Sequence, residues 1–394
     1  MRVLHVITRL IVGGAQENTI ASVLGLRQRH GVEAHLLAGP TRGPEGSLEP
    51  TIARFLTLVP TLTRPVRPLA DLRAYRQLLA LFRQQPPDIV HTHSGKAGIL
   101  GRWAAARAAV PVVIHTIHGP SFGPFQGALP NALFRQAERL AGHRTTHFVA
   151  VAEAMTAQYL AAGIGHPAQY TTVRSGFALG PFLNARNDLA LRAQLGLGPQ
   201  DFVVGKIARL FQLKGHDDLF AIAPRLVAAH PEIRFLFVGD GEWRARFGQQ
   251  ARQLGLEKHF RFTGLVPPTD VPKYLGVMDA LVHLSEREGL PRALPQALAA
   301  GKPVLAYDCD GAREVCRDGE TGFLIPPGDL ARLAARLQQL ARHPDLRTQL
   351  GAQGRELVRA QFSVEKMVDD LYALYVRLLP PSAAASSRLP TPPP

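Results

Sequence analysis

The sequence predicts an α/β protein made of two doubly wound, parallel-sheet domains in tandem. The chain has 394 residues, which is too long for a single hydrophobic core of ordinary size. Short runs rich in Val, Ile and Leu alternate with longer helical patterns, which is typical of parallel sheets covered by helices. The alternation occurs in two series, and Gly, Pro and Asn gather between them at 176–190. We therefore expect two domains with a cleft between them.

Twelve runs are expected to form strands. In the first series they span residues 2–8, 33–38, 54–59, 88–93, 111–118 and 147–151. In the second series they span 202–208, 233–239, 261–264, 279–284, 303–308 and 322–325. Three helical patterns follow, at 329–343, 345–362 and 363–379, and the segment 380–394 has too little apolar surface to order itself. These boundaries predict domains at 1–180 and 181–362 and a disordered tail at 380–394.

Composition narrows the class of protein. Apolar residues make up 46% of the chain and charged residues 19%, the balance of a globular enzyme. The two cysteines, Cys309 and Cys316, provide no disulfide framework and favour a reducing compartment. Arg9 interrupts the mildly apolar start, and no apolar run approaches the roughly 18 residues of a membrane-spanning helix. We expect a cytoplasmic protein with neither a signal peptide nor a membrane span.

Positive charge is concentrated in the first half of the chain. Of the formal net charge of +14, residues 1–180 contribute +10, with 18 Lys and Arg against 8 Asp and Glu. Many of these arginines lie in 64–83, which reads as a basic amphipathic helix. Such a helix either lies against an anionic surface or is a solvated face. One expected partner is therefore an anionic membrane, which the protein would contact on the membrane's inner face. Nucleic acid is not, because no nucleic-acid motif accompanies the charge.

Two loops that follow expected strands carry residues suited to an anion. Gly13 and Gly14 come directly after the first strand, where glycine lets the backbone approach a ligand and the next helix offers its first amides. A tight turn would need glycine as well. Arg209 and Lys214 stand five residues apart after the strand at 202–208. Two cations at the carboxyl end of a strand suit the adjoining phosphates of a diphosphate, although a solvated turn would also tolerate them.

A third element, "SEREGLPRALPQALAAG", follows the strand at 279–284. Pro291 is well placed at the first position of a helix, which would leave the amides of Gly289 and Leu290 at the helix N-terminus. That end carries about half a positive charge and can hold a phosphate. Glu288 stands just outside it, either as part of a binding site or as a cap that satisfies the helix dipole.

Together these elements resemble the family 4 retaining glycosyltransferases of GT-B fold. The glycine loop, the Arg-x4-Lys loop and the Glu-x7 helix occur in the family's order and at its separations, from Gly13 to about Gly328. The resemblance includes "FVGDGEWR", "VMDALVHLSEREGLP", "AAGKPVLA" and "GETGFLIPPGD". It implies two Rossmann-like domains that face each other across a cleft. The second would bind most of a nucleotide-sugar donor, and the first an acceptor.

The resemblance also implies roles for individual residues. Arg209 and Lys214 would hold the diphosphate, while Glu288 and the amides of Gly289 and Leu290 would hold sugar hydroxyls.

Further positions match the first domain and the end of the family's pattern. His118 matches the first-domain histidine beside the donor sugar, and Gly14, next to Gly13, matches the glycine that faces the phosphates. The helix at 363–379 would cross back to the first domain. The chain departs from the pattern at Gln296, where the family has a second glutamate that binds ribose.

Two features read as candidate metal ligands, and we expect neither to bind metal. Asp308 and Asp310 form a D-x-D motif, but it follows a late strand in a segment that this family uses for donor contacts. Close histidine pairs occur at two strand ends, without supporting Cys or Asp partners for zinc, and they comprise His91, His93, His115 and His118.

The expected activity is therefore a retaining, metal-independent and cofactor-free sugar transfer. The donor would be a nucleotide-sugar, by frequency a UDP-sugar, and the acceptor a glycan or a lipid-linked molecule. Two alternatives remain at this point. A sugar-nucleotide epimerase or hydrolase of the same fold would turn over the donor without an acceptor, and a non-catalytic lipid- or polyanion-binding protein would not turn it over.

Overall fold

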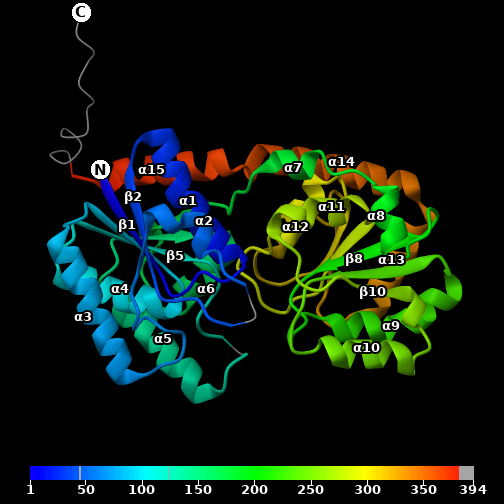
Figure 1. The fold of residues 1–394 in the computed structure, drawn as a ribbon, viewed down its shortest axis with the longest axis horizontal. Coiled ribbons are helices and arrows are strands. Elements are labelled where there is room, and N and C mark those ends of the chain that lie inside the picture. The colour runs from blue at the N-terminus through cyan, green and yellow to red at the C-terminus, as the bar shows by residue number, and fades with distance from the viewer. Residues whose placement is uncertain (44–45, 124, 381–394) are drawn as a thin grey trace, which may run out of the picture. The chain divides into compact units, whose positions relative to one another are not determined.

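The computed structural model describes residues 1–43, 46–123 and 125–380 and divides the chain into two compact units. Unit 1 comprises Met1–Phe177 and the segment that begins at Val364, and unit 2 comprises Ala178–Ser363 (Figure 1). From residue 381 on, the expected disordered tail lies outside the described residues.

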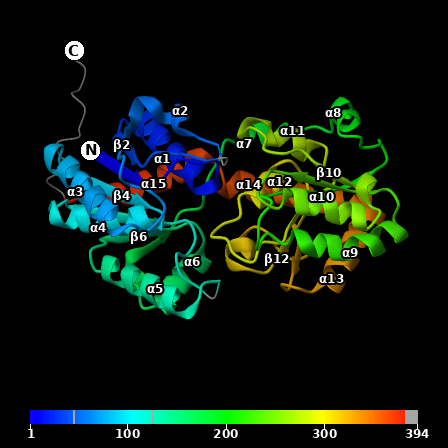
Figure 2. The same ribbon diagram turned by 60° about the horizontal axis from the view of Figure 1, so that its bottom comes forward.

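Unit 1 contains a parallel sheet of seven strands in the order β3-β2-β1-β4-β5-β6-β7. The strands are β1 (Arg2–Ile7), β2 (Glu33–Ala38), β3 (Leu56–Leu58), β4 (Ile89–His93), β5 (Val112–Ile117), β6 (His147–Ala150) and β7 (Tyr170–Thr172). The helices are α1 (Gly14–His30), α2 (Glu49–Ile52), α3 (Pro68–Gln84), α4 (Gly95–Arg107), α5 (Ala128–Gly142), α6 (Glu153–Ala161) and α15 (Val364–Leu378). Helices α1 and α15 cover one face of the sheet and α3, α4 and α5 the other (Figures 1 and 2).

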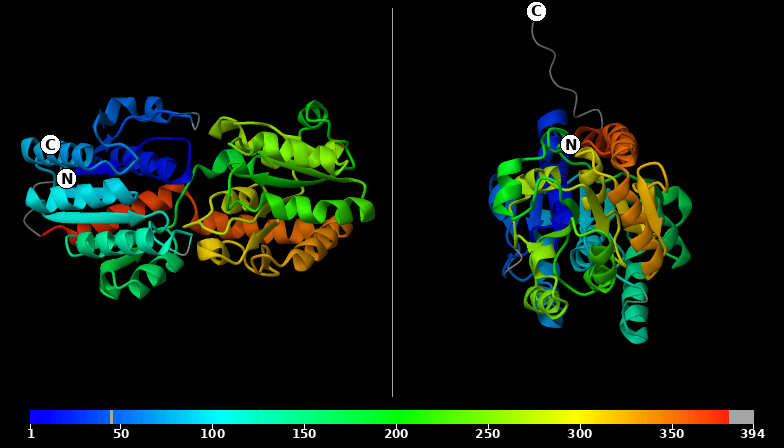
Figure 3. Two further views of the ribbon diagram at one scale, coloured as in Figure 1. Left: turned by 90° about the horizontal axis from the view of Figure 1, so that it is seen from below. Right: turned by 90° about the vertical axis from the view of Figure 1, so that its right-hand side faces the viewer.

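Helix α15, the last helix of the described residues, completes the core of unit 1. In α15 the buried side chains recur at helical spacing and face α1 and the sheet; they are Met367, Val368, Leu371, Leu374 and Tyr375. A Cβ at Gly25 of α1 would lie 2.4 Å from a methyl group of Val368, so glycine is what allows the two helices to pack this closely. Figure 3 shows α15, in red, among the blue and cyan elements of unit 1.

Unit 2 contains a parallel sheet of six strands in the order β10-β9-β8-β11-β12-β13. The strands are β8 (Phe202–Ile207), β9 (Ile233–Val238), β10 (Phe260–Phe262), β11 (Ala280–His283), β12 (Val304–Tyr307) and β13 (Gly322–Ile325). The helices are α7 (Leu179–Leu183), α8 (Leu189–Gln194), α9 (His216–Ala229), α10 (Arg244–Gln253), α11 (Val271–Gly276), α12 (Ala293–Ala299), α13 (Leu330–Arg342) and α14 (Pro344–Gln361). Helices α9, α10 and α13 share the core on one face, and α12 packs with α14 and α7 on the other.

Both sheets reverse their winding direction once, and open α/β sheets usually bind ligands at such a point. In unit 1 the chain leaves β1 toward one edge of the sheet and β4 toward the other, and in unit 2 it does the same at β8 and β11. Loops that leave neighbouring strands in opposite directions open a crevice at the carboxyl ends of the strands. The first glycine loop and both motif loops of the second half lie at these two positions.

The two doubly wound, Rossmann-like units confirm the expected fold class. All twelve expected strands are present within one or two residues of their expected bounds. Strand β7 was not expected, because its residues Tyr170–Thr172 include no Val, Ile or Leu and so form no apolar run. Within the described part of the chain, no helix has both the length and the hydropathy to cross a bilayer.

Candidate active site

The two motif loops of unit 2 are in direct contact. In the loop after β8, Leu213 and Gly215 adopt left-handed backbone conformations, with φ of 65° and 63°. A Cβ at Gly215 would lie 2.2 Å from the carbonyl oxygen of Leu284, in the loop after β11. Only glycine therefore lets the first loop approach the second this closely. The contact places Lys214, one residue earlier, next to the second loop.

Lys214 and Glu288 form an ion pair where these loops meet. The Lys214 ammonium lies 2.5 Å from Glu288 Oε1 and donates to Ser285 Oγ at 3.2 Å. His283 Nε2 approaches the same carboxylate at 3.6 Å. Burial alone would raise the pKa of Glu288, but His283 and Lys214 outweigh it and hold the pKa well below its usual value. Glu288 is therefore an ionised acceptor, with its side chain 27% exposed.

Asp310 holds the backbone of Glu288 in place. Its Oδ2 accepts a hydrogen bond of 2.7 Å from the Glu288 amide, and Asp310 itself takes a left-handed φ of 49°. The other acid of the D-x-D motif, Asp308, is paired with Arg313 at 2.5 Å. The two carboxylates thus have separate partners, and we assign Asp310 a positioning role that sequence reasoning missed.

Lys206 is a second cation of this region that sequence reasoning missed. It lies in β8, is 1% exposed, and is close enough to Lys214 and Glu288 to feel both charges. Burial, with the nearby Lys214, lowers the pKa of Lys206 to about 7. A lysine inside the run "FVVGKIA" is masked by its apolar neighbours, so only its burial in the structure draws attention to it.

Arg209 lies in the same loop as Lys214 and is exposed. Its guanidinium is 5.9 Å from the ring centre of Phe211. The loop after β8 thus presents one exposed cation and one paired with Glu288.

The helix of the third motif begins later than predicted. Helix α12 starts at Ala293, two residues after Pro291, because the Leu294 amide bonds to the Pro291 carbonyl in a tight turn. Gly289 and Leu290 are buried in the turn that precedes the helix, so their amides do not form its end. Gln296 lies in the first turn of α12 and is partly buried.

The predicted residues of unit 1 lie beside its own reversal point. Gly13 precedes α1 in an extended conformation, with φ of 174°, and a Cβ there would meet only the end of the Gln16 side chain, at 2.9 Å. Neither its backbone nor its packing therefore requires glycine. Gly14 is exposed at the first position of α1. His118 follows β5, and its Nε2 lies 3.0 Å from Nδ1 of His93.

A cluster of histidines of metal-ligating type lies deeper in unit 1. Ring nitrogens of His5, His91 and His93 lie within 4.8 Å of one another. Both nitrogens of His91 are bonded, to the Tyr375 hydroxyl at 2.5 Å and the Thr116 hydroxyl at 2.6 Å. Both nitrogens of His93 bond to other histidines. A metal ion would have to displace these bonds, so the donor set does not favour one.

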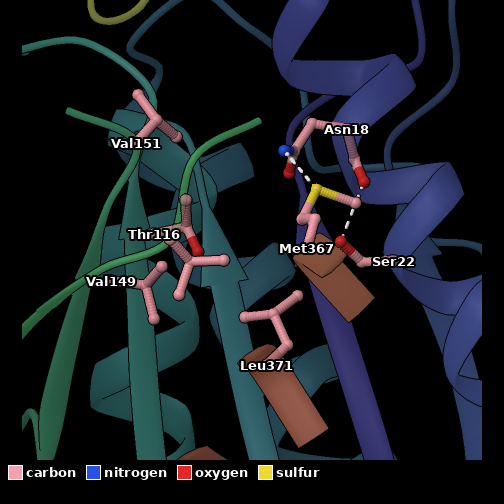
Figure 4. Close-up of a pocket in the computed structure, with 8 residues that line it drawn as sticks. Asn18, Ser22, Thr116, Val149, Val151, Met367 and Leu371 are labelled. Carbon is pink, nitrogen blue, oxygen red and sulfur yellow. Dashed lines mark hydrogen bonds between the residues drawn. The ribbon is translucent and has the colours of Figure 1, made fainter. Parts of the chain in front are cut away.

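A small cavity in unit 1 does not qualify as a substrate site. It lies between α1, α15 and the sheet, and its lining includes Asn18, Ser22, Thr116 and Met367 (Figure 4). Its volume of about 10 Å³ has room for about one water molecule. No sugar or nucleotide fits there.

Comparison with known proteins decides the family. Residues 13–176 match the sequence model of the glycosyl transferase 4-like domain, and residues 187–357 match that of glycosyl transferases group 1. The chain is 31% identical over 327 residues to EpsD of Bacillus subtilis, which is described as a glycosyltransferase, covering 80% of this chain and 83% of that protein. This chain is a family 4 glycosyltransferase. Its two units are the two domains of the GT-B fold.

Further relatives of this glycosyltransferase include proteins with named substrates. An Escherichia coli UDP-Gal:alpha-D-GlcNAc-diphosphoundecaprenol alpha-1,3-galactosyltransferase is 28% identical over 327 residues, covering 82% of this chain and 83% of that one. Among solved structures, the Anabaena protein HepE in complex with UDP-glucose has a TM-score of 0.81 at 23% identity, covering 96% of this chain and all of that one. At this identity the structural likeness shows the fold alone.

Proposed function

We propose that this glycosyltransferase moves a sugar, with retention of anomeric configuration and without a metal, from a UDP-sugar to a glycan or lipid-linked acceptor. The ion pair of Lys214 and Glu288 at the reversal point of unit 2 carries the proposal. In this pair a cation of a type that binds phosphate lies beside a carboxylate of a type that accepts from sugar hydroxyls. The complexes of HepE with UDP-glucose and the substrates in the name of the Escherichia coli relative support the choice of donor and acceptor.

In this mechanism the bond between the anomeric carbon and the diphosphate oxygen breaks, and charge builds up on the leaving diphosphate. Lys214 and Arg209, with Lys206 behind them, stabilise that charge, which is the largest contribution expected of such preorganised donors. A bound diphosphate also favours the protonated form of Lys206, whose pKa is about 7 in the free protein. Glu288 and the amides of Gly289 and Leu290 hold the sugar hydroxyls, and Gly13 and Gly14 leave room for the phosphates.

The acceptor hydroxyl attacks from the face that the diphosphate leaves. A retaining mechanism through a covalent intermediate needs a carboxylate nucleophile about 5 Å from a second acid. Glu288 is instead held by Lys214, so we assign it to sugar binding. The proton of the acceptor hydroxyl then passes to an oxygen of the departing phosphate as the new glycosidic bond forms.

A panel of UDP-, GDP-, ADP- and dTDP-sugars in a thermal-shift experiment tests the donor. Tight binding to the native state raises the melting temperature by mass action, and we expect the largest rise with a UDP-sugar. Product analysis with and without acceptor then separates transfer from hydrolysis or epimerisation. Donor turnover that is independent of acceptor would contradict the proposal.

Transfer is expected to persist in excess chelator. Arg313 and the Glu288 amide bind the two acids of the D-x-D motif. On this proposal the lysines and Arg209, and not a metal ion, therefore bind the diphosphate. The measurement is the initial rate of transfer after EDTA treatment, with a magnesium-dependent kinase as a control for complete chelation. Loss of activity that Mn²⁺ restores would assign the motif to a metal.

Replacing Gln296 with alanine should raise the dissociation constant of the nucleotide about fivefold, equivalent to roughly 1 kcal/mol. On this proposal the neutral amide bonds the ribose, at about 0.5 to 1.5 kcal/mol a bond, whereas Gln296→Glu would form charge-assisted bonds of about 1.5 to 3 kcal/mol. The glutamate variant should therefore bind at least as well as the wild type. Nucleotide titration of both variants decides this, and equal affinities in all three proteins would remove Gln296 from the site.

The exposed face of α3 supports peripheral association with an anionic membrane. Leu69 and Leu72 are 76% and 44% exposed, among arginines of residues 64–83 that are themselves exposed. Asp71 is the acid of this segment, and Lys96 neutralises it at 2.6 Å. Helix α5, on the same face of the sheet, exposes Leu129 and Leu133. Apolar side chains within a basic field match the headgroup region of an anionic bilayer.

Binding to anionic vesicles is therefore expected, and it should weaken as salt rises, because attraction between surface charges is screened beyond about 10 Å at 0.1 M. The double variant Leu69→Ser, Leu72→Ser should bind less at every salt concentration. Leu265→Ser is a matched control, since Leu265 is 52% exposed in unit 2. Co-sedimentation measures all three proteins, and equal binding of the wild type to neutral and anionic vesicles would rule out the electrostatic attraction.

A further inference from the structure

Three imidazoles of unit 1 form a hydrogen-bonded line that ends at His118. His5 Nδ1 lies 3.0 Å from His93 Nε2, and His93 Nδ1 lies 3.0 Å from His118 Nε2. In both pairs the ring centres are 5.3 Å apart, and the ring planes differ by 13° and 29°. Because this separation equals the hydrogen-bond length plus the two ring radii, the rings meet edge to edge and not face to face.

Strand alternation and the order of strands in the sheet explain why these three histidines lie next to one another. His5 in β1 is paired in register with His91 in β4, and His93 points to the same side two residues later. Strand β5, which precedes His118, is the next neighbour of β4. The line therefore runs across three adjacent strands, from the middle of β1 to the carboxyl edge of the sheet.

The two buried imidazoles of the line, those of His5 and His93, are neutral. His5 and His93 are 0% and 1% exposed. Burial lowers the pKa of His5 to about 3, and burial together with the neighbouring histidines lowers that of His93 well below its usual value. A neutral imidazole has one donor nitrogen and one acceptor nitrogen. Every hydrogen bond in the line must then point the same way.

The buried end of the line sets this direction. Among the described residues, His5 Nε2 has no hydrogen-bond partner. If the bonds pointed from His118 to His5, this nitrogen would carry a buried proton without an acceptor. In the opposite direction it carries only a lone pair, and buried N–H groups without an acceptor are rarer in proteins than acceptors without a donor. The bonds therefore point outward, and His93 Nδ1–H donates to His118 Nε2.

We infer that His5 and His93 are positioning residues that hold His118 in its Nδ1–H tautomer, so that the ring meets the donor sugar as a neutral hydrogen-bond donor and not as a base. This role rests on the proposed function and on the family resemblance, which implies that His118 lies beside the donor sugar. A free histidine side chain prefers the Nε2–H tautomer, so the line reverses the preference of the isolated ring. A sugar hydroxyl oxygen would accept from Nδ1.

Nitrogen-15 NMR of the histidines in the donor-free, full-length protein tests the inference. Two-bond proton–nitrogen correlations distinguish the two tautomers and the imidazolium, and the signals that disappear in His118→Gln assign His118 among the 15 histidines. At neutral pH we expect a protonated Nδ1 and an unprotonated Nε2. A protonated Nε2, in either the neutral ring or the imidazolium, would overturn the proposal.

A matched pair of variants tests whether the line is the cause. His93→Asn keeps an amide N–H at the place of Nδ1, whereas His93→Leu has a similar volume and no donor. His118 should stay in the Nδ1–H tautomer in the first and change to Nε2–H in the second. The same tautomer in both would overturn the role of the line. Should either variant fail to fold, as monitored by thermal unfolding, the wild-type spectrum alone decides.

Kinetics complete the test. For the donor sugar, kcat/KM should fall at least tenfold further in His93→Leu than in His93→Asn, although both keep His118. Equal losses in the two variants would contradict a role in catalysis. Because the tautomer is measured without donor or acceptor, failure of the transfer assay would reject the proposed function and leave the NMR result standing.

Discussion

Replacing Lys214 with alanine should lower kcat/KM by about two orders of magnitude or more, and Arg209→Ala should do the same. Both side chains lie in the loop after β8, and each would offer positive charge to the leaving diphosphate. In Lys214→Ala the loss is compounded, because Glu288 keeps its negative charge beside the diphosphate without the partner that lies 2.5 Å away. Steady-state kinetics with saturating acceptor measures the effect.

A surface lysine of the same unit provides the control for the loss of charge. Lys273 is exposed and pairs with Asp270 at 2.7 Å, so Lys273→Ala removes the same charge away from the motif loops. Its kcat/KM should stay within about twofold of wild type, since exposed pairs contribute little. Wild-type kinetics in both Lys214→Ala and Arg209→Ala would reject the assignment of the diphosphate to this loop.

The second large effect is expected from Glu288→Gln, which keeps the shape of the side chain and removes its charge. Each charge-assisted bond to a sugar hydroxyl that becomes a neutral one loses roughly 1 kcal/mol, so two such bonds would weaken binding of the UDP-sugar about 30-fold. Binding of UDP alone should be no weaker than in the wild type, because a negative charge near the diphosphate has been removed. Calorimetric titration with both ligands measures this difference.

Glu286 offers a matched comparison. It lies two residues earlier in the same loop, is exposed, and loses the same charge in Glu286→Gln. We expect that variant to bind both ligands as the wild type does. If Glu288→Gln weakened UDP as much as the UDP-sugar, the carboxylate would act on the nucleotide and not on the sugar.

Much of the fold was predictable because its signals are local. Strands buried on both faces of a parallel sheet are continuous apolar runs, and the helices between them keep their own period. The start of α12 was not predictable in the same way. Proline at 291 is compatible with a first helical position, but the tight turn that it forms with Leu294 delays the regular helix to Ala293. Short edge strands such as β7 also depend on their neighbours for pairing.

The candidate site was predictable only in part, for a related reason. Arg209, Lys214 and Glu288 stand out because charged residues follow apolar strands at an edge where ligands bind. Asp310 and Lys206 act through contacts that no spacing reveals: one bonds to an amide 22 residues earlier in the chain, and the other lies inside a strand. His5 belongs to the same class, since its partner His93 is 88 residues away.

The place of α15 in unit 1 has a consequence for the order in which the protein is made. The side chains that close the core against α1 belong to the last helix of the described chain, and in the sequence the whole of unit 2 comes between them and the rest of unit 1. During translation, unit 2 therefore emerges from the ribosome in full while unit 1 still exposes the apolar face of α1. Domains usually fold in the order of synthesis. Here the synthesis of unit 1 starts first, but its folding finishes after that of unit 2. A nascent chain stopped before Val364 would therefore hold a folded second domain and an open first one.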